Sequence, residues 1–409
     1  MSKIKVTWLC TPWYLSGGEL IGGTLTRLTN WIRFWDWDKY EIELILGGVN
    51  SEMMVKTKKY FESLGHISVK NLGGLHPIHK WPMGGLRQLR RYLQAFAPDI
   101  LHTIFIQSDI AAGLVQRDEG IPIHISSLEG ALVPWFASPF KRFTYKLGYA
   151  AIRNKLSAVI ALCQTTAFES VRDFGTPQNK IQVIYSGLHL KEFPFKSGWP
   201  YMERQKPPII GTIGRLSREK IPNLLVEAAP YVLKRFPETR FVLAGSGPEK
   251  ENLEGLARQR GVRDKFEFLG PIHQVALTLN GFDLFIFTSK FEGLPWTILE
   301  AQAVGVPILA SAVGGVAEII KDGLNGILLH TNDSNELANK ISWLLENRDS
   351  AIAMGHAGRE IIEKKFTVQR EVREIQNLYE EMIDKRIISS AHDKKILYCP
   401  SENLDTYKD

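Results

Sequence analysis

The chain has 409 residues, of which 44% are hydrophobic and 23% charged, and its formal net charge is +6 at pH 7. This length predicts about two or three domains, and the composition is that of an ordinary globular protein with substantial cores. The positive charge favours anionic partners, whether nucleic acid, phosphorylated ligands or a membrane face. The sequence has no helix-turn-helix, zinc-finger or RNA-binding aromatic signature, so no nucleic-acid partner is expected.

The sequence predicts a cytoplasmic protein without membrane-spanning helices. Its N-terminal apolar run, 4–9, lacks a charged leader and a small-residue cleavage site, so no signal peptide is expected. No apolar stretch approaches the ~20 residues of a spanning helix. Cys10, Cys163 and Cys399 lie far apart, which disfavours a disulfide framework or a zinc site and fits a reducing compartment.

The N-terminal half begins with a predicted strand at 3–9, a glycine-rich loop and a predicted helix at 25–34, as in a doubly wound domain. The loop lacks the spaced dinucleotide fingerprint and no P-loop lysine follows it, so hydride transfer and NTP hydrolysis are not supported. Its glycine pairs, Gly17-Gly18 and Gly22-Gly23, permit close approach by a ligand or simply form a flexible turn. Alternating patterns then predict a parallel sheet covered by helices, with strands at 42–46, 67–69, 100–104, 121–125, 158–162 and 181–184 and helices at 53–63, 86–96, 110–117, 140–155 and 165–174.

Four histidines and one Asp-x-Asp motif of this half are candidates for metal or ligand contact. The motif at 36–38 precedes a strand, on the face away from strand carboxyl ends, so a structural role is favoured over a metal site. His76 and His79 fall in a loop with no nearby carboxylate or cysteine, which favours loop surface. His102 and His124 lie near strand carboxyl ends, where each can meet a ligand or be a hydrogen-bonded structural histidine.

Residues 131–157 contain no Asp or Glu but carry five cations interleaved with aromatic residues: Lys141, Arg142, Lys146, Arg153 and Lys155 among Trp135, Phe136, Phe140, Phe143, Tyr145 and Tyr149. Such a helix can lie on an anionic leaflet. Alternatively, its aromatics form the core side of an ordinary amphipathic helix.

Glycines and prolines in 185–208 mark a candidate linker. A second alternation follows, with strands predicted at 209–213, 240–244, 265–269, 284–287 and 307–310 and helices at 221–235, 250–259, 275–279, 297–304 and 335–346. We therefore predict two Rossmann-like α/β domains that face a cleft, at 1–200 and 201–366. After a helix at 349–365, a last helix at about 367–386 is expected to pack back on the first domain, and the tail at 387–409 is expected to be loosely ordered.

The stretch 289–301 is the most informative of the chain. Glu292 follows the predicted buried strand 284–287 in a turn marked by Gly293 and Pro295. The predicted helix begins directly afterwards, so its first N–H groups can point outward at a phosphate or at sugar hydroxyls. These are the N–H groups of Leu294, Trp296 and Thr297.

Glu300 lies further along the same predicted helix and can reach the same crevice as Glu292. Two carboxylates beside a helix N-terminus indicate a sugar nucleotide. The alternative is a capped strand–helix junction with a solvated Glu300.

Other strand ends of this half carry cations and glycines. Arg215 and Lys220 follow the strand 209–213, where two cations can hold a diphosphate. Glycines mark the ends of three strands: Gly214, Gly245, Gly247, Gly314 and Gly315. Because they share one edge of the predicted sheet, a binding crevice explains them better than separate turns do.

Residues 211–329 resemble the nucleotide-sugar half of family 4 of the retaining glycosyltransferases, which have the GT-B fold. The matching stretches are 214–216 with Lys220, 244–248, 291–295 with 300–301, and 314–318. The Glu-x7-Glu element and the Arg/Lys pair are together specific. The N-terminal half matches more loosely through its glycine loop, 98–102 and 183–188, so the resemblance covers about 4–386.

The resemblance implies transfer of a hexose, with retention, from a nucleotide-diphosphate sugar without a metal or other cofactor. It implies a catalytic role for Arg215 and Lys220, which would stabilise the leaving diphosphate, and for Glu292, which would contact the donor sugar. Glu300 would take the ribose hydroxyls. The remaining donor contacts implied are Gly293, Leu294, Thr297, Gly214, Gly245, Gly247, Gly17 and Gly18, and the acceptor or sugar contacts are Glu129, His102, Gly22 and Gly23.

Three positions depart from the family pattern. Many relatives have a histidine after the fifth strand, where this chain has 126–130, so Glu129 takes its place or the role is absent. Cys163 replaces a usual serine and Ser186 a usual asparagine. These departures leave the acceptor chemistry open.

The expected enzyme uses a UDP-sugar in preference to a GDP-sugar and builds a surface polysaccharide or lipopolysaccharide on a glycan or lipid-linked acceptor. It is expected in the cytoplasm, peripheral at the inner face of the plasma membrane if 131–157 binds lipid. The alternative from another class is a non-catalytic GT-B subunit that binds a sugar nucleotide or scaffolds a partner. A pyridoxal-phosphate-dependent phosphorylase and a sugar-nucleotide epimerase are further rivals.

Overall fold

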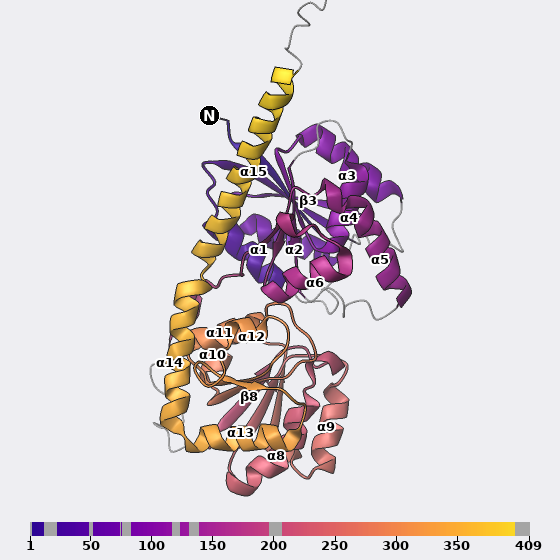
Figure 1. Cartoon of the computed structure of the whole chain (residues 1–409). Coiled ribbons are helices and arrows are strands. Elements are labelled where there is room, and N and C mark those ends of the chain that lie inside the picture. The colour runs from indigo at the N-terminus through magenta and orange to yellow at the C-terminus, as the bar shows by residue number, and fades with distance from the viewer. Residues whose placement is uncertain are drawn as a thin grey trace, which may run out of the picture.

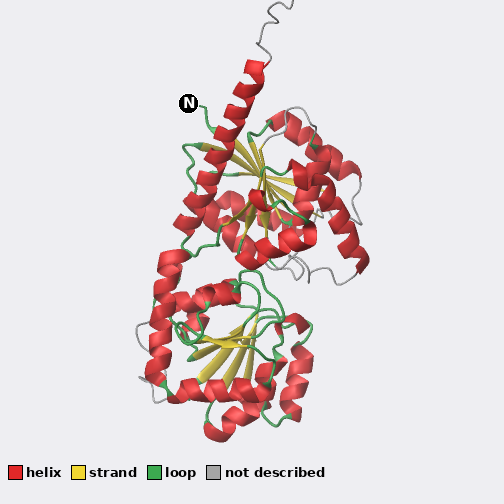
Figure 2. Cartoon of the chain, viewed as in Figure 1, coloured by secondary structure: helices red, strands yellow, loops and turns green. Residues whose placement is uncertain are grey.

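The computed structural model describes residues 2–11, 23–48, 52–73, 75, 83–116, 123–130, 139–195 and 207–396. They form two α/β domains, each with one parallel sheet between helices (Figures 1 and 2). The predicted fold class, two Rossmann-like domains in the GT-B arrangement, is confirmed.

The N-terminal sheet has the strand order β3-β2-β1-β4-β5-β6-β7. Its strands are β1 (Ile4–Cys10), β2 (Tyr40–Gly48), β3 (Ser68–Gly73), β4 (Ile100–Ile104), β5 (Ile123–Leu128), β6 (Ala158–Ala161) and β7 (Ile181–Val183). Its helices are α1 (Gly23–Phe34), α2 (Glu52–Ser63), α3 (Met83–Phe96), α4 (Ile106–Val115), α5 (Pro139–Ile152) and α6 (Gln164–Phe174). The order reverses between β1 and β4, and ligands of such sheets bind outside the carboxyl ends at that point.

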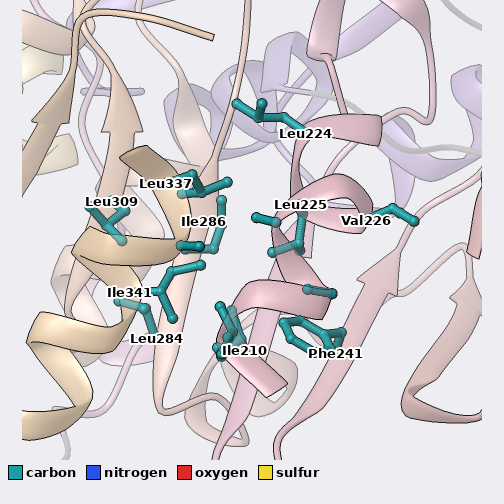
Figure 3. Close-up of a cluster of buried hydrophobic side chains, with 14 of the residues drawn as sticks. Ile210, Leu224, Leu225, Val226, Phe241, Leu284, Ile286, Leu309, Leu337 and Ile341 are labelled. Atoms are coloured by element: carbon teal, nitrogen blue, oxygen red, sulfur yellow. The ribbon is translucent and has the colours of Figure 1, made fainter. Parts of the chain in front are cut away.

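The C-terminal sheet has the order β10-β9-β8-β11-β12-β13, so its reversal lies between β8 and β11. Its strands are β8 (Ile209–Ile213), β9 (Arg240–Ala244), β10 (Phe266–Gly270), β11 (Leu284–Phe287), β12 (Ile308–Ser311) and β13 (Ile327–Leu329). Its helices are α8 (Asn223–Arg235), α9 (Lys250–Gln259), α10 (Val275–Asn280), α11 (Trp296–Val304), α12 (Val316–Ile319), α13 (Ser334–Glu346) and α14 (Arg348–Lys365). Figure 3 shows apolar side chains of α8 and α13 packed on strands of this sheet, which fixes the strand ends that carry the candidate site.

Short or polar elements were predicted less well than long apolar ones. β13 and α12 were missed, because three or four residues give too little periodicity to recognise. β5 runs to Leu128, beyond the predicted end at 125, because Ser126 and Ser127 are polar yet fully buried.

The chain returns to the N-terminal domain through α15 (Val368–Ile396): Figure 1 shows α14 running along the C-terminal domain and α15 along the N-terminal one. Val368, Ile375 and Tyr379 of this helix lie in the N-terminal core, packed with residues of β1 and α1. The helix continues past 386, so the first part of the segment 387–409 is helical. A charged i,i+4 pair, Lys385 with Glu381 at 2.6 Å, supports the helical turn just before this segment.

Part of the predicted linker, 196–206, lies outside the described residues. In the part of the chain that is described, none of the helices is both long enough and apolar enough to cross a membrane.

Candidate functional site

The carboxyl ends of the two sheets face each other, with α11 and α12 at the edge of the C-terminal domain nearest the N-terminal one (Figure 1). Gly23, the first residue of α1, lies against Trp296 of α11. A Cβ at Gly23 would lie 2.6 Å from Trp296 Cδ1, so this approach of the two domains requires glycine. Gly23, one of the predicted acceptor residues, thus lies beside the start of α11, where the predicted donor residue Thr297 is found. Gly17, Gly18 and Gly22 lie outside the described residues.

Lys220 and Glu292 meet at the reversal point of the C-terminal sheet. The Lys220 ammonium donates to Oε1 of Glu292, and it lies 5.3 Å from the centre of the Phe287 ring. The Glu292 side chain is only 11% exposed and that of Lys220 27%, so the pair is partly shielded from water. An ammonium held in this way is a fixed positive charge at the carboxyl ends of β8 and β11.

Hydrogen bonds to backbone carbonyls join the two loops that carry this pair. Thr288 Oγ1 donates to the carbonyls of Lys220 and Ile221, at 2.9 and 3.0 Å, and Lys290 N donates to Glu219 O at 2.8 Å. Ile221 has φ 45°, a left-handed conformation that a β-branched residue rarely adopts. Such strain persists where the surroundings over-determine it, as these bonds do here.

Arg215 is 44% exposed and pairs with Glu219 at 3.1 Å. An exposed pair contributes little to stability, so the guanidinium can exchange Glu219 for an anionic ligand. Arg215 thus lies on the same short loop as Lys220, which the predicted pair of phosphate-binding cations requires.

The glycines after β8 and β9 have a packing role. A Cβ at Gly245, where φ is 137°, would lie 1.9 Å from Gly214 O, and one at Gly247 would lie 2.2 Å from Leu216 O. The two loops therefore pack backbone to backbone, with Leu216 N donating to Ser246 O at 2.9 Å. Gly214, at φ 157°, belongs to the same contact. Direct donor contact by Gly214, Gly245 and Gly247 remains a prediction.

The turn before α11 is braced by the loop 314–315. Gly293 O accepts from Gly315 N at 2.9 Å, and Gly314, at φ 52°, packs on Glu292 O. Leu294 is buried at 6% exposure, so only its backbone can serve a ligand. α11 begins at Trp296, one residue before the prediction, and no described side chain caps it. Thr297 lies in this first, uncapped turn.

Glu300 is buried on α11, and burial raises the pKa of its carboxyl to about 7. Within the described residues no ion pair neutralises it. The carboxyl therefore changes charge near neutral pH, which matters if it accepts ribose hydroxyls as predicted.

We expect donor affinity to depend on Glu300 ionisation. Because the pKa is raised to about 7, the carboxylate dominates at pH 8 and the neutral acid at pH 6. Affinity for UDP, measured by calorimetry, should fall about tenfold between pH 8 and pH 6. Glu300→Gln should remove Glu300's share of this change, since the amide does not titrate, while any titration of UDP remains in both proteins. Equal pH dependence in the two proteins would contradict the prediction.

Glu318 of α12 makes a contact between the domains. The residue was part of the matching stretch 314–318, but this contact was not predicted. Its carboxylate accepts from the N–H groups of Gln164 and Thr165, at 2.8 and 2.9 Å, at the start of α6. Thr165 Oγ1 and Tyr185 OH donate to it at 3.1 and 3.0 Å. A carboxylate at a helix N-terminus is favourable, so Glu318 holds α6 against the loop that braces Glu292.

Cys163, one of the predicted departures from the family pattern, acts as the N-cap of α6. Its Sγ accepts from Thr166 N at 3.4 Å, and a Cβ at Gly315 would lie 3.1 Å from it. Burial raises the pKa of this thiol to about 11, so it stays protonated and unreactive at neutral pH.

Glu129 directly follows β5, its side chain is buried, and it is held by residues of α1. The Arg27 guanidinium donates to it, and Thr24 Oγ1 donates at 3.4 Å. Arg27 also donates to Glu371 of α15 at 2.5 Å and stacks on Trp31, 4.5 Å from the ring centre. Arg27 and Glu371 were not predicted as site residues. The available signal was a charge on the apolar face of a predicted helix.

His102 and His124 lie in the core of the N-terminal domain. His102 is 0% exposed and bonds to Tyr379 OH at 2.6 Å and Ser127 Oγ at 2.8 Å. Burial lowers the pKa of His102 well below its usual value and that of His124 to about 3, so both are neutral. His102, predicted at the acceptor side, thus has no solvent contact in this structure.

Of the other polar candidates, the Asp-x-Asp motif occupies a turn. In the motif 36–38, Asp36 Oδ1 accepts from the N–H groups of Asp38 and Lys39, at 3.1 and 3.2 Å, as in an ordinary Asx turn. His76 and His79 lie outside the described residues.

Comparisons with known proteins bear on the whole chain. The family model for glycosyl transferases group 1 matches residues 198–361, and that for Glycosyltransferase Family 4 matches residues 21–192. The chain belongs to the family 4 glycosyltransferases. The matches divide it as the two sheets do.

The following similar proteins are distant in sequence. An uncharacterized glycosyltransferase of Methanocaldococcus jannaschii, MJ1607, is 29% identical over 54% of this chain and 59% of that protein. The UDP-Gal:alpha-D-GlcNAc-diphosphoundecaprenol alpha-1,3-galactosyltransferase of Escherichia coli is 24% identical over 74% of this chain and 80% of that protein. Anabaena HepE, solved with UDP, superposes with a TM-score of 0.76 at 19% identity, covering 92% of this chain and all of HepE, which shows a shared fold.

Proposed function

We propose that the chain transfers a hexose, with retention of anomeric configuration, from a UDP-sugar to a glycan or lipid-linked acceptor of surface polysaccharide or lipopolysaccharide synthesis. The observation that carries the proposal is the Lys220–Glu292 pair, shielded beside the uncapped start of α11 at the sheet reversal. Positive charge, a carboxylate and free helix N–H groups at one point are what a sugar diphosphate requires.

Each residue has a role in the proposed step. The bond from the anomeric carbon to the diphosphate oxygen breaks, and Lys220 and Arg215 stabilise the charge that grows on that oxygen. The acceptor oxygen bonds to the same face of the anomeric carbon, and its proton passes to the departing phosphate. Glu292 contacts the donor sugar and Glu300 the ribose. Lys220 and Arg215 compensate the negative charge of the leaving diphosphate, so the proposal includes neither metal nor cofactor.

The choice of donor and acceptor rests on the relatives. Solved structures of HepE contain UDP and UDP-glucose, and the Escherichia coli relative is named for UDP-galactose and a diphosphoundecaprenol acceptor. These support a UDP-sugar and a lipid-linked acceptor for this chain. A cytoplasmic location, at the inner face of the plasma membrane, follows from that pairing of donor and acceptor.

A panel of donors tests the proposal. UDP-glucose, UDP-galactose, UDP-GlcNAc and GDP-mannose are incubated with the protein and a chelator, and nucleotide release is measured. We expect slow hydrolysis of one UDP-sugar, accelerated by membrane extract as a source of acceptor. NMR of the new linkage should show the α configuration of the donor.

The rival is a non-catalytic subunit that binds a sugar nucleotide. It predicts tight binding of one nucleotide, but no release of it with or without membrane extract. Preference for a GDP-sugar, or release that requires added metal, would overturn the finer parts of the proposal and leave the transferase class intact.

A further inference from the structure

Helix α5 has two apolar faces. Tyr145, Tyr149 and Ile152 point into the core and are at most 1% exposed. Phe140, Phe143 and Leu147 occupy the other side and are 70%, 64% and 62% exposed. Their spacing of three and four residues puts them on one stripe of the helix. The described aromatics of α5 are thus divided between core and surface, while Trp135 and Phe136 of the segment 131–157 lie outside the described residues.

Cations accompany the exposed stripe. Lys141 is exposed, and the side chains of Arg142 and Lys146 are 41% and 36% exposed. α5 carries no carboxylate of its own. The acidic group that faces it is Asp173 of α6, which is 10% exposed and lies 3.5 Å from Arg142 and 3.8 Å from Lys146. Arg172 also pairs with Asp173, at 2.6 Å, so the surface keeps a positive excess.

We propose that this surface of α5, namely Phe140, Phe143 and Leu147 with Lys141, Arg142 and Lys146, docks the protein on an anionic lipid leaflet. Aromatic and leucine side chains enter the headgroup boundary while the cations meet anionic headgroups. The inference deepens the proposed function, since it names the surface that would bring the site to a lipid-linked acceptor. Its test reads lipid binding and not sugar transfer.

A lipid leaflet fits this surface better than a protein partner. Protein interfaces are depleted of lysine, whereas Lys141 and Lys146 flank the exposed phenylalanines. The stripe also lies on a single helix. Its side chains can therefore insert shallowly into a flat leaflet, whereas a protein partner would find little surface to enclose. Figure 1 shows α5 on the flank of the N-terminal domain, on the other side from α15, where no second domain covers it.

The test is sedimentation with vesicles of phosphatidylcholine containing phosphatidylglycerol, and with vesicles of phosphatidylcholine alone. We expect wild type to bind the anionic vesicles and salt to weaken the binding. Lys141→Ala should weaken it about fivefold, which corresponds to about 1 kcal/mol. Phe140→Glu with Phe143→Glu should weaken it by more than about tenfold. Leu277→Glu, at a position 66% exposed on α10, and Lys250→Ala, exposed on α9, are matched controls and should leave binding unchanged.

Thermal unfolding midpoints and donor hydrolysis in lipid-free solution should be the same in all these proteins, because none of the substitutions touches a core or the donor site. Wild type that does not bind anionic vesicles, or α5 variants that bind as well as wild type, would overturn the inference. So would a wild-type dimer that the phenylalanine variants abolish without any lipid binding, since a second copy would then cover α5. Lipid binding without hydrolysis of any donor would support this inference and contradict the proposed function.

Discussion

Lys220→Ala is expected to lower kcat for donor cleavage by about a hundredfold to a thousandfold, the usual effect of removing one group that stabilises charge in a transition state. The Lys220 ammonium is held by Glu292 and by the ring of Phe287, so it is already oriented before the donor binds. A preorganised charge stabilises the leaving diphosphate more than the intact donor, in which less negative charge has developed. The loss should therefore fall on kcat more than on KM, measured by nucleotide release.

Lys290→Ala is the matched control, because Lys290 is an exposed lysine three residues after the end of β11, and alanine keeps its backbone bond to Glu219. It should keep kcat within about twofold of wild type, as expected of a surface charge away from the reacting groups. Glu292→Gln combined with Lys220→Ala should cost less than the two separate losses together, since the groups act as one unit. A Lys220→Ala enzyme with unchanged kcat and a raised KM would show that Lys220 only binds the donor.

The contact between Lys220 and Glu292 could be predicted because both residues follow strand ends. Lys220 and Glu292 lie 72 positions apart in sequence, but each comes just after a strand next to the sheet reversal. Parallel strands end at one edge, so the alternation of strands and helices alone brings the two side chains together. The left-handed Ile221 and the bonds from Thr288 that hold this loop follow from no local pattern.

The acceptor side could not be predicted in the same way. His102 lies within β4, near its carboxyl end, yet Tyr379 of α15 bonds to it, and that contact spans 277 positions of sequence. Glu318 reaches α6 across 153 positions to Thr165, from the other domain. Periodicity reports which face of an element is apolar, not which distant element covers it. For the same reason, the partners of Arg27 could not be predicted from the sequence.

Arg27→Met is expected to lower the free energy of unfolding of the N-terminal domain by about 3–5 kcal/mol. Arg27 is 1% exposed and pairs with both Glu129 and Glu371, whose side chains are 6% and 0% exposed. Methionine keeps much of the stem volume but leaves two buried carboxylates without a cation. Trp31 Nε1 and Gly187 N still donate to Glu371, at 3.0 and 2.7 Å, which satisfies hydrogen bonds without neutralising charge.

The loss should depend on pH in a direction that identifies its cause. Burial raises the pKa of Glu129, and Arg27 opposes that shift, so Arg27→Met should raise this pKa further. A carboxyl with a raised folded-state pKa favours folding while protonated, and that contribution disappears as pH rises through the folded value. The variant should therefore lose more stability at pH 8 than at pH 5, measured by urea unfolding followed by tryptophan fluorescence. Arg33→Met, on the same helix, is the control, because Arg33 and its partner Glu192 are 41% and 45% exposed and the pair is worth about 1 kcal/mol or less. If Arg27→Met and Arg33→Met cost the same at both pH values, the buried triad does not hold α1 and α15 together, and Glu129 owes its position to the backbone after β5 alone.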